Sequence, residues 1–197
     1  MPDIIHAHNC LFAGVVALII KKKNKIPYVI TEHSSAYARG LISSRQAKII
    51  GQVLKNADVK TVVSANLGSL LENKFGADAC PNYPIFNILD ERFEKEEIVF
   101  KGVKPNKELF TYLNIAIFSP NKNQSNLLYD FAWKFKGNSN VRLKIGGDGH
   151  LRKQIETKAK DLEIEKQVIF TGLLSREKVL REMRNCDVFV LSSTFET

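Results

Sequence analysis

Three groups of residues in this 197-residue sequence have types and spacing that could support chemistry. Three histidines lie near the start of the chain, at His6, His8 and His33. Imidazole can act as a general base or as a metal ligand. A glycine cluster, Gly146 to Gly149, could let backbone N–H groups approach a phosphate. The carboxylate of Glu196 follows Ser192, Ser193 and Thr194, and could accept a hydrogen bond from a sugar hydroxyl or cap a following helix.

The histidines do not by themselves make a metal centre. The period of two in a strand puts His6 and His8 on one face, but no third ligand has suitable spacing. The sequence contains no Cys-x-x-Cys, no His-Glu-x-x-His and no Asp-x-Asp pair to hold a divalent ion against a diphosphate. We therefore predict no metal site. His33 lies at the carboxyl end of the strand expected at 27–31, where ligands collect, so a ligand contact and a structural role both stay open.

The glycine cluster also has more than one interpretation. It is not a Walker A loop, because no Gly-Lys-Ser/Thr follows, and Arg152 occupies the place of the third glycine of a dinucleotide fingerprint. It formally fits the Gly-x-x-Gly of an RNA-binding KH loop, but the surrounding pattern predicts a parallel sheet instead. Considered alone, such a cluster is more often a tight turn than a binding site, so the neighbouring elements must decide.

The elements around this cluster alternate apolar runs with polar, helix-like segments. The runs at 141–149, 167–172 and 187–196 are separated by amphipathic segments near 151–162 and 176–184. This is the βαβαβ rhythm of a parallel sheet. The carboxyl ends of its strands meet at one edge, where helix N-termini offer N–H groups to anions. The C-terminal end of the chain is therefore predicted to bind a nucleotide or a phosphate.

The N-terminal half repeats the rhythm. Strands are expected at residues 3–8, 27–31, 58–63 and 77–80. Helices are expected between them, with Asn9 and Ser64 as N-caps and Gly76 as a C-cap. Residues 85–107 carry dense charges and Pro105 but no sustained period, which indicates a linker. The predicted fold class is therefore α/β, with Rossmann-like parallel-sheet domains at 1–84 and 108–197 joined by residues 85–107.

Composition indicates a globular, core-forming protein, with 44% hydrophobic and 25% charged residues. The net charge of +8 favours anionic partners, although a lysine-rich solvated surface explains it equally well. Three cysteines without pairing spacing indicate a reducing compartment. The apolar run from Leu11 to Ile20 is too short to span a bilayer, which takes about 20 residues, and lacks the flanks of a signal peptide.

Taken in order, these segments resemble glycosyltransferase family 4, whose members have the GT-B fold and retain the anomeric configuration. The matching segments are Pro2–His8, Ile26–His33, Val62–Ser64, Pro81–Asn82, Ile145–Gly149, Val168–Gly172, Asp187–Leu191 and Phe195–Glu196. Lys122, before the helix that contains Leu127 and Leu128, matches the family's lysine. The resemblance implies a GT-B arrangement of an acceptor-side domain at 1–84 and a nucleotide-sugar domain at 108–197.

The same resemblance implies roles for particular residues. Lys122 is expected to contact the donor phosphates, His33 to hydrogen-bond the transferred sugar, and Glu196 to contact the donor sugar or ribose. These three are the expected catalytic residues. The nucleotide is expected to lie on Gly147, Gly149, Gly172, Leu173 and Leu174.

The sequence departs from the family pattern at three places. Ile117 stands where the family usually has an arginine, Asn123 replaces a glycine, and Ser192-Ser193 replaces Pro-Ser. The family's glycine-rich strand would precede Met1, and its second glutamate would follow Thr197. We therefore expect an internal part of a longer enzyme, with both domains truncated.

The resulting functional hypothesis is a retaining transferase with a UDP- or GDP-linked sugar donor and no further cofactor. A glycan or glycolipid acceptor, a role in cell-surface polysaccharide synthesis and a cytoplasmic location, peripheral at the inner face of an anionic membrane, complete it. The alternative is a non-catalytic nucleotide-binding module or degenerate paralogue, which Ile117 favours. A nucleic-acid binder is disfavoured because the aromatic residues fall in predicted core positions rather than between basic ones.

Overall fold

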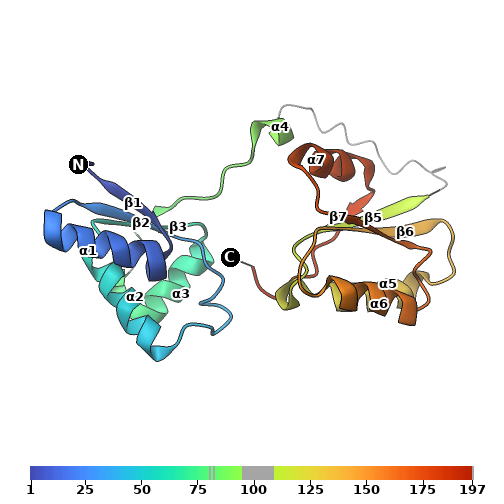
Figure 1. The fold of residues 1–197 in the computed structure, drawn as a ribbon, viewed down its shortest axis with the longest axis horizontal. Helices are drawn as coiled ribbons and strands as arrows, with labels where there is room; N and C mark the ends of the chain where they lie inside the picture. Colours follow the sequence, from blue (N-terminus) through green and yellow to red (C-terminus); the bar gives the residue numbers. More distant parts are fainter. Residues whose placement is uncertain (80, 82, 95–108, 197) are drawn as a thin grey trace. The chain divides into compact units, whose positions relative to one another are not determined.

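The computed structural model describes residues 1–79, 81, 83–94 and 109–196. These residues form two compact units, which we call unit 1 (Met1–Leu89, with Phe195 and Glu196) and unit 2 (Asp90–Thr194). Each unit is built around its own four-stranded parallel sheet (Figure 1). The boundary between the units falls inside the segment expected as a linker. The first residues of that segment include a short helix, α4 (Glu91–Glu94), and residues 95–107 of it lie outside the described residues.

The sheet of unit 1 has the order β1-β2-β3-β4. Its strands are β1 (Ile5–His8), β2 (Tyr28–Glu32), β3 (Val59–Val62) and β4 (Tyr83–Pro84). The first two strands align with Ile5 opposite Tyr28. Because every neighbouring pair is parallel, the carboxyl ends of all four strands lie at the same edge of the sheet.

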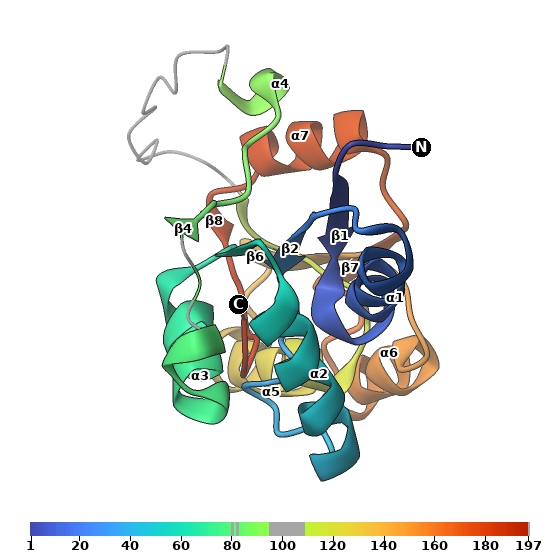
Figure 2. The ribbon, with the colours of Figure 1, turned by 90° about the vertical axis from the view of Figure 1, so that its left-hand side faces the viewer.

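Three α-helices connect the strands of unit 1 and share one core with the sheet. They are α1 (Gly14–Asn24), preceded by the single π-turn η1 (Asn9–Ala13), α2 (Ser44–Asn56) and α3 (Ala65–Phe75). Figure 2 shows α2 between α1 and α3. Tyr28 and Ile30 of β2 are fully buried together with Val53 of α2 and Leu67 of α3. These apolar side chains pack between the sheet and its helices, as expected for a parallel sheet covered by helices.

The helix caps of unit 1 follow local sequence chemistry. The Ser64 hydroxyl accepts a hydrogen bond from the N–H of Leu67, and Gly76 ends α3 with a φ of 85°. The Asn9 side chain accepts from the N–H of Leu11, 2.9 Å away, inside η1, the turn that leads into α1. The capping predictions for Ser64 and Gly76 are confirmed. The prediction that Asn9 is an N-cap is wrong, because Asn9 is the first residue of η1, and the caps of η1 and α1 are His8 and Ala13.

The prediction of a strand at 77–80 is wrong for residues 77–79, and residue 80 lies outside the described residues. Ala77–Ala79 form the 3₁₀ turn η2, in which the N–H of Ala79 donates to the carbonyl of Gly76 at 3.0 Å. Lys60 holds the same turn from β3 by donating to the carbonyl of Asp78 at 2.8 Å. These hydrogen bonds coil the chain where the apolar sequence indicated extension.

The sheet of unit 2 has the order β7-β6-β5-β8. Its strands are β5 (Phe110–Ile115), β6 (Val141–Gly146), β7 (Val168–Gly172) and β8 (Val188–Phe189). The chain adds β6 and β7 on one side of β5 and then returns to place β8 on the other side. The direction of winding therefore reverses at β5, which makes the β5/β8 edge a topological switch point.

Helices cover both faces of the sheet in unit 2. Helices α5 (Gln124–Phe135) and α6 (Arg152–Asp161) lie on one face and α7 (Arg176–Asn185) on the other (Figure 1). Leu143 and Ile145 of β6 and Leu128 of α5 are fully buried in the core. Lys144 of β6 forms an ion pair with Glu182 at 2.6 Å, which ties α7 to the sheet.

The strand expected at 187–196 is much shorter than predicted, because β8 spans only Val188–Phe189. Beyond it the Val190 N–H still donates to the carbonyl of Leu113, but the Thr194 N–H donates to Asn121 instead. The chain therefore leaves the sheet for the turn after β5, and Glu196 does not end a strand. Within the described ranges, no helix has the length and apolar character needed to cross a bilayer.

Asp58, just before β3, links the first residue of β2 to the last turn of α1. Its carboxylate accepts hydrogen bonds from Lys21 Nζ at 2.7 Å and from the N–H of Tyr28 at 2.9 Å. Burial alone would raise the pKa of Asp58, but these hydrogen bonds and the charge of Lys21 outweigh it and lower the pKa. The ionised form is therefore favoured in the folded protein.

We predict that Asp58→Asn destabilises unit 1 at about pH 7 by roughly 0.5–1 kcal/mol, a modest cost because the pair is partly exposed. The folded pKa lies below the unfolded value of 3.8, so the unfolded chain binds the proton more readily. The stabilisation is present above that value and is lost as the pH falls through the folded pKa. The melting temperature of the variant should lie below that of the parent at about pH 7, and the two should be equal at about pH 2. Asp3→Asn, at an exposed position, is the control, and an equal gap at both pH values would contradict the prediction.

Candidate functional site

A buried carboxylate organises the strand ends of unit 1. Glu32, the last residue of β2, is only 1% exposed. Its Oε1 accepts hydrogen bonds from the N–H groups of His33 and Ser34, both at 2.9 Å. Its Oε2 accepts from the N–H of Cys10 at 2.9 Å and from the hydroxyl of Tyr37 at 2.8 Å. The four donors satisfy both oxygens, as a buried carboxylate requires.

The partners of Glu32 are held in their protonated forms. Burial, reinforced by the charge of Glu32, raises the pKa of the Cys10 thiol. Burial also raises the pKa of the Tyr37 hydroxyl, and the neighbouring Cys10 and Glu32 raise it further. A protonated tyrosine can donate to the carboxylate, and a protonated thiol is a poor nucleophile. We therefore assign no covalent chemistry to this cluster.

The structure brings together the three histidines singled out in the sequence. The His6 and His8 rings lie 4.4 Å apart between centroids, and the His8 ring meets the His33 ring edge-on at 5.6 Å. His6 Nε2 also hydrogen-bonds the hydroxyl of Thr31 at 2.7 Å. Burial, followed by the neighbouring His6 and His33, lowers the pKa of His8, which favours its neutral form. Across the part of the chain that can be described, no group of three or more His, Cys, Asp or Glu is arranged to hold a metal ion.

In unit 2 the glycine cluster lies against the segment that follows β5. A Cβ on Gly147, whose φ is 118°, would come within 2.0 Å of the Ala116 carbonyl oxygen. A Cβ on Gly149, at φ 157°, would lie 2.5 Å from the Phe118 carbonyl oxygen. Two stretches of backbone thus approach each other closely, and only glycine fits both the space and the dihedral angles.

The N–H groups of these glycines are used inside the protein. Gly147 donates to the carbonyl of Gly172 at 2.8 Å, and Gly149 donates to the carboxylate of Asp148 at 2.7 Å. The carbonyl of Asp148 in turn accepts from the N–H of Phe118 at 2.9 Å. Contact of Gly147 and Gly149 with a nucleotide stays a prediction, and it would rest on close backbone approach rather than on free N–H donors.

Lys122 lies in the 3₁₀ turn η3 (Pro120–Lys122), which leads into α5. Its carbonyl accepts a hydrogen bond from the Ser192 hydroxyl at 2.7 Å, and the carbonyl of Asn121 accepts from the N–H of Thr194 at 2.9 Å. These bonds join the segment after β5 to the segment after β8. Lys122 is therefore placed at the topological switch point, beside the segment that leads to Glu196.

The loop after β7 supplies an apolar wall next to the glycine cluster. The Leu174 side chain comes within 2.9 Å of the place where a Cβ on Gly146 would lie, so it packs directly on that glycine. Leu173 is 78% exposed, and Gly172 turns the chain with a φ of 70°. The expected contact of these residues with a nucleotide base stays a prediction.

Sequence reasoning gave no role to two buried polar residues that hold these loops. One is Glu32, and the other is Gln124, which is 1% exposed and donates from Nε2 to the carbonyl of Ile117 at 3.2 Å. A glutamate at the end of a strand that buries Tyr28 and Ile30 is the signal that could have identified Glu32.

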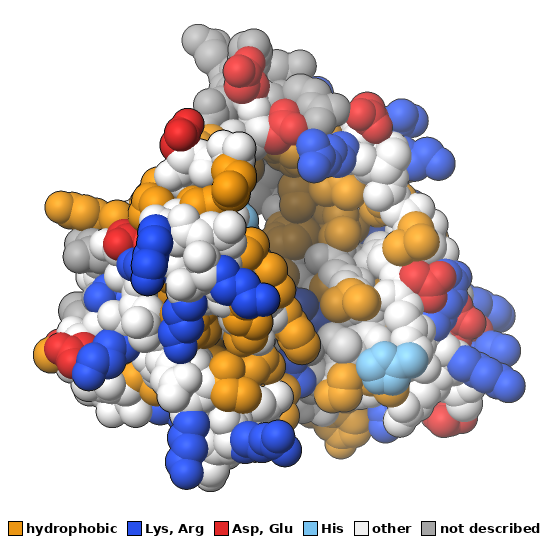
Figure 3. Space-filling model, turned by 60° about the vertical axis from the view of Figure 1, so that its left-hand side comes forward, with side chains coloured by type: hydrophobic (Ala, Val, Ile, Leu, Met, Phe, Trp, Pro, Cys, Tyr) orange, Lys and Arg blue, Asp and Glu red, His pale blue; other side chains and the backbone are white. Residues whose placement is uncertain are grey.

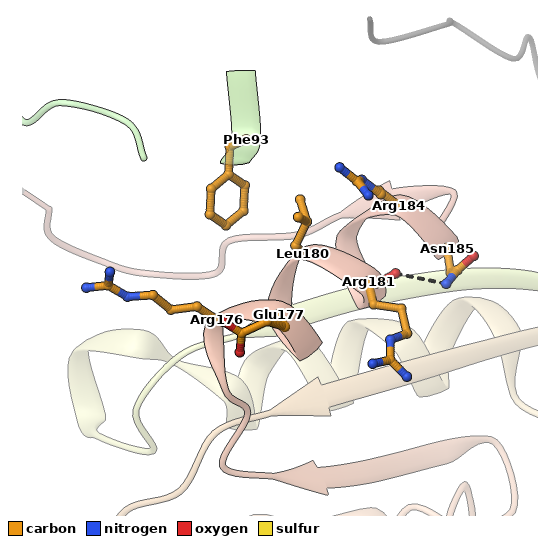
Figure 4. Close-up of a pocket in the computed structure, with 7 residues that line it drawn as sticks. All are labelled: Phe93, Arg176, Glu177, Leu180, Arg181, Arg184 and Asn185. Carbon is orange, nitrogen blue, oxygen red and sulfur yellow. Dashed lines mark hydrogen bonds between the residues drawn. The ribbon is translucent and has the colours of Figure 1, made fainter. Parts of the chain in front are cut away.

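Unit 2 also has a surface hollow, which these residues do not line. It has a volume of about 370 Å³ and is lined by Phe93 of α4 and by side chains of α7, among them three arginines (Figure 4). Phe93 points toward Leu180, and Arg176 approaches the carboxylate of Asp90 at 3.5 Å. None of the predicted site residues lines this hollow.

Two parallel sheets flanked by helices, each with its functional candidates at the carboxyl ends of the strands, define a pair of Rossmann-like units. The family model described as "Glycosyl transferases group 1" matches residues 94–197, and the model "Glycosyltransferase Family 4" matches residues 1–92. The two models together cover nearly the whole chain, which therefore belongs to the glycosyltransferases that these models describe. Its fold is of the GT-B type.

Individual proteins show the same similarity. The chain is 26% identical to the alpha-monoglucosyldiacylglycerol synthase of Streptococcus pneumoniae over 99% of its own length and 47% of that protein. Among solved structures, HepE of Anabaena in complex with UDP and glucose gives a TM-score of 0.79 at 20% identity, with 98% of this chain and 53% of HepE covered. Sucrose-phosphate synthase of Thermosynechococcus elongatus gives a TM-score of 0.79 at 16% identity, with 98% of this chain and 51% of the synthase covered. The chain thus spans about half the length of the relatives that it matches.

We predict that Gly147→Ala destabilises unit 2 by more than about 3 kcal/mol, because strain at positive φ adds to a clash with the Ala116 carbonyl. Gly137→Ala is the matched control, since Gly137 has a φ of 82° but open space around its Cβ position. It should cost only about 1 kcal/mol. Chemical denaturation followed by circular dichroism would measure both. Equal losses would show that the close backbone approach contributes little.

Proposed function

We propose that this chain is part of an enzyme that transfers a sugar from a UDP- or GDP-linked donor to a glycan or glycolipid acceptor, with retention of the anomeric configuration. The observation that carries the proposal is the position of Lys122. Hydrogen bonds to Ser192 and Thr194 hold its turn at the point where the winding of unit 2 reverses. Open α/β sheets bind their ligands at this point, outside the carboxyl ends of the strands.

The proposed chemistry is electrostatic stabilisation of the leaving group. Departure of a nucleoside diphosphate develops negative charge on its phosphate oxygens, and a fixed cation stabilises that charge in the transition state. Lys122 is the proposed cation. Gly172, Leu173 and Leu174 would hold the base, Glu196 would hydrogen-bond the donor sugar or ribose, and His33 would hydrogen-bond the transferred sugar.

The comparisons support the donor and the acceptor class. HepE of Anabaena is described in complex with UDP and glucose, and the name of the Streptococcus pneumoniae relative indicates a glucosylated diacylglycerol product. By analogy with these two proteins, we propose a nucleotide-sugar donor and a lipid-linked acceptor for this chain.

A cytoplasmic location, peripheral at the inner face of an anionic membrane, extends the proposal. Phe12, Val16 and Ile19 are 75%, 57% and 48% exposed along η1 and α1. The exposed Lys22 and Lys23 follow at the end of α1. Exposed apolar side chains beside lysines suit a surface of anionic lipid.

One observation favours a non-catalytic nucleotide-binding module as the second candidate. Ile117, at the position where the family resemblance leads one to expect arginine, is 62% exposed. An exposed isoleucine there cannot neutralise a diphosphate. A nucleic-acid binder has less support, because the face drawn in Figure 3 shows Lys and Arg side chains dispersed among apolar and neutral ones rather than gathered in one stripe.

Binding of UDP and GDP to the protein encoded by the complete gene, measured by calorimetry with CMP for comparison, tests the proposal. We expect Lys122→Ala to weaken diphosphate binding by roughly 2–3 kcal/mol, the value of a charge-assisted hydrogen bond at a partly buried site. Lys22→Ala is the control, because Lys22 is exposed on α1 of unit 1, and it should leave the affinity unchanged. Unchanged binding in Lys122→Ala would contradict the assigned phosphate contact. Binding without any release of nucleotide from UDP-glucose or GDP-mannose would favour the second candidate.

We also predict that removal of divalent metal leaves turnover intact. The sequence has no Asp-x-Asp pair, and the residues that the structure describes include no cluster of His, Cys, Asp and Glu arranged for a metal ion. Nucleotide release should therefore proceed at the same rate in excess EDTA, because Lys122 would take the place of the metal. Loss of activity in EDTA with recovery in manganese would overturn this prediction.

A further inference from the structure

We infer that Glu32 is the positioning residue for His33, a role that rests on the proposed function of His33 toward the transferred sugar. The carboxylate of Glu32 is buried at the end of β2, one residue before His33. It would act through the backbone and not by touching substrate.

The four hydrogen bonds of Glu32 come from separate parts of the chain. Cys10 belongs to η1, which follows β1, whereas His33 and Ser34 begin the loop that follows β2. Tyr37, 7% exposed, lies further along the same loop and donates its hydroxyl. One side chain therefore fixes the first two N–H groups of the loop and joins them to the turn after β1. The His33 ring then meets the ring of His8 edge-on.

Only a carboxylate can accept all four bonds. An ionised carboxylate offers acceptors on both oxygens, whereas an amide offers one oxygen and one NH₂ group. In Glu32→Gln the NH₂ group must face either the N–H groups of His33 and Ser34 or the donors of Cys10 and Tyr37. The Tyr37 hydroxyl can reverse and accept from the NH₂ group, but a backbone N–H cannot. At least one buried N–H, that of Cys10 or those of His33 and Ser34, would therefore lose its acceptor, and the loop would move to relieve it.

The first test measures nucleotide release from UDP-glucose and GDP-mannose by the protein encoded by its complete gene. Glu32→Gln should lower kcat about 100-fold, the loss that a displacement of about 1 Å causes, while the donor KM changes much less. Tyr37→Phe removes one hydrogen bond and leaves the backbone N–H groups paired, so it should fold and lose less than Glu32→Gln. Glu182→Gln, which breaks the partly buried ion pair with Lys144 in unit 2, is the matched control and should keep its kcat.

A double-mutant cycle separates positioning from a merely structural role. If Glu32 acts through His33, adding Glu32→Gln to His33→Ala should lower kcat no further. An equal further loss in both backgrounds would overturn the proposal.

Amide hydrogen exchange of His33 and Ser34 gives a readout that does not depend on activity. Both amides should exchange at least about 10-fold faster in Glu32→Gln than in the parent or in Glu182→Gln, because the amide cannot accept from all four donors and the loop that carries both N–H groups moves. Unchanged exchange would overturn the proposal even if kcat fell. If His33→Ala keeps its kcat, the proposed function of His33 fails, and Glu32 then has no catalytic group to position.

Discussion

In unit 2, the close approach of two backbone segments positions the turn that carries Lys122 at the switch point. Gly147 and Gly149 lie against Ala116 and Phe118, so the loop after β6 fixes the course of the chain as it leaves β5. That course leads into η3 and places Lys122 where the hydroxyl of Ser192 can reach its carbonyl. Because the glycines have no Cβ, the two segments pack without side chains between them. Unit 2 thus places a charged side chain by means of backbone contact.

In unit 1 the loops at the strand ends are held by a buried carboxylate instead of by close backbone approach. Glu32 gathers N–H groups from the two segments that follow β1 and β2, and burial makes each of those bonds costly to lose. The loop that carries His33 is therefore stabilised by a side chain from the sheet itself. The two units share a parallel-sheet design and a strand-end location for their candidate residues, but they hold those residues by different interactions.

Sequence reasoning succeeded where the determining interactions are local. Ser64 and Gly76 bound α3 as predicted, because a cap depends on residues within one turn. It failed at 77–80 and beyond Phe189, where hydrogen bonds from Lys60 and to Asn121, distant in the sequence, bend the chain. The glycine cluster was noticed, but its cause, the Ala116 carbonyl, is visible only in three dimensions. Glu32 was overlooked because the apolar strand before it indicates burial, but the donors from Cys10 and Tyr37 that make this burial possible are visible only in three dimensions.

The burial of Cys10 has a consequence for how motion in unit 1 could be followed. Its thiol is 0% exposed, and burial raises its pKa, so alkylating reagents cannot attack it while the strand ends are closed. The backbone N–H of the same residue is bound to Glu32. Reaction of Cys10 therefore requires the region around the carboxylate to open. The rate of Cys10 alkylation, measured by mass spectrometry, then reports the rate of that opening.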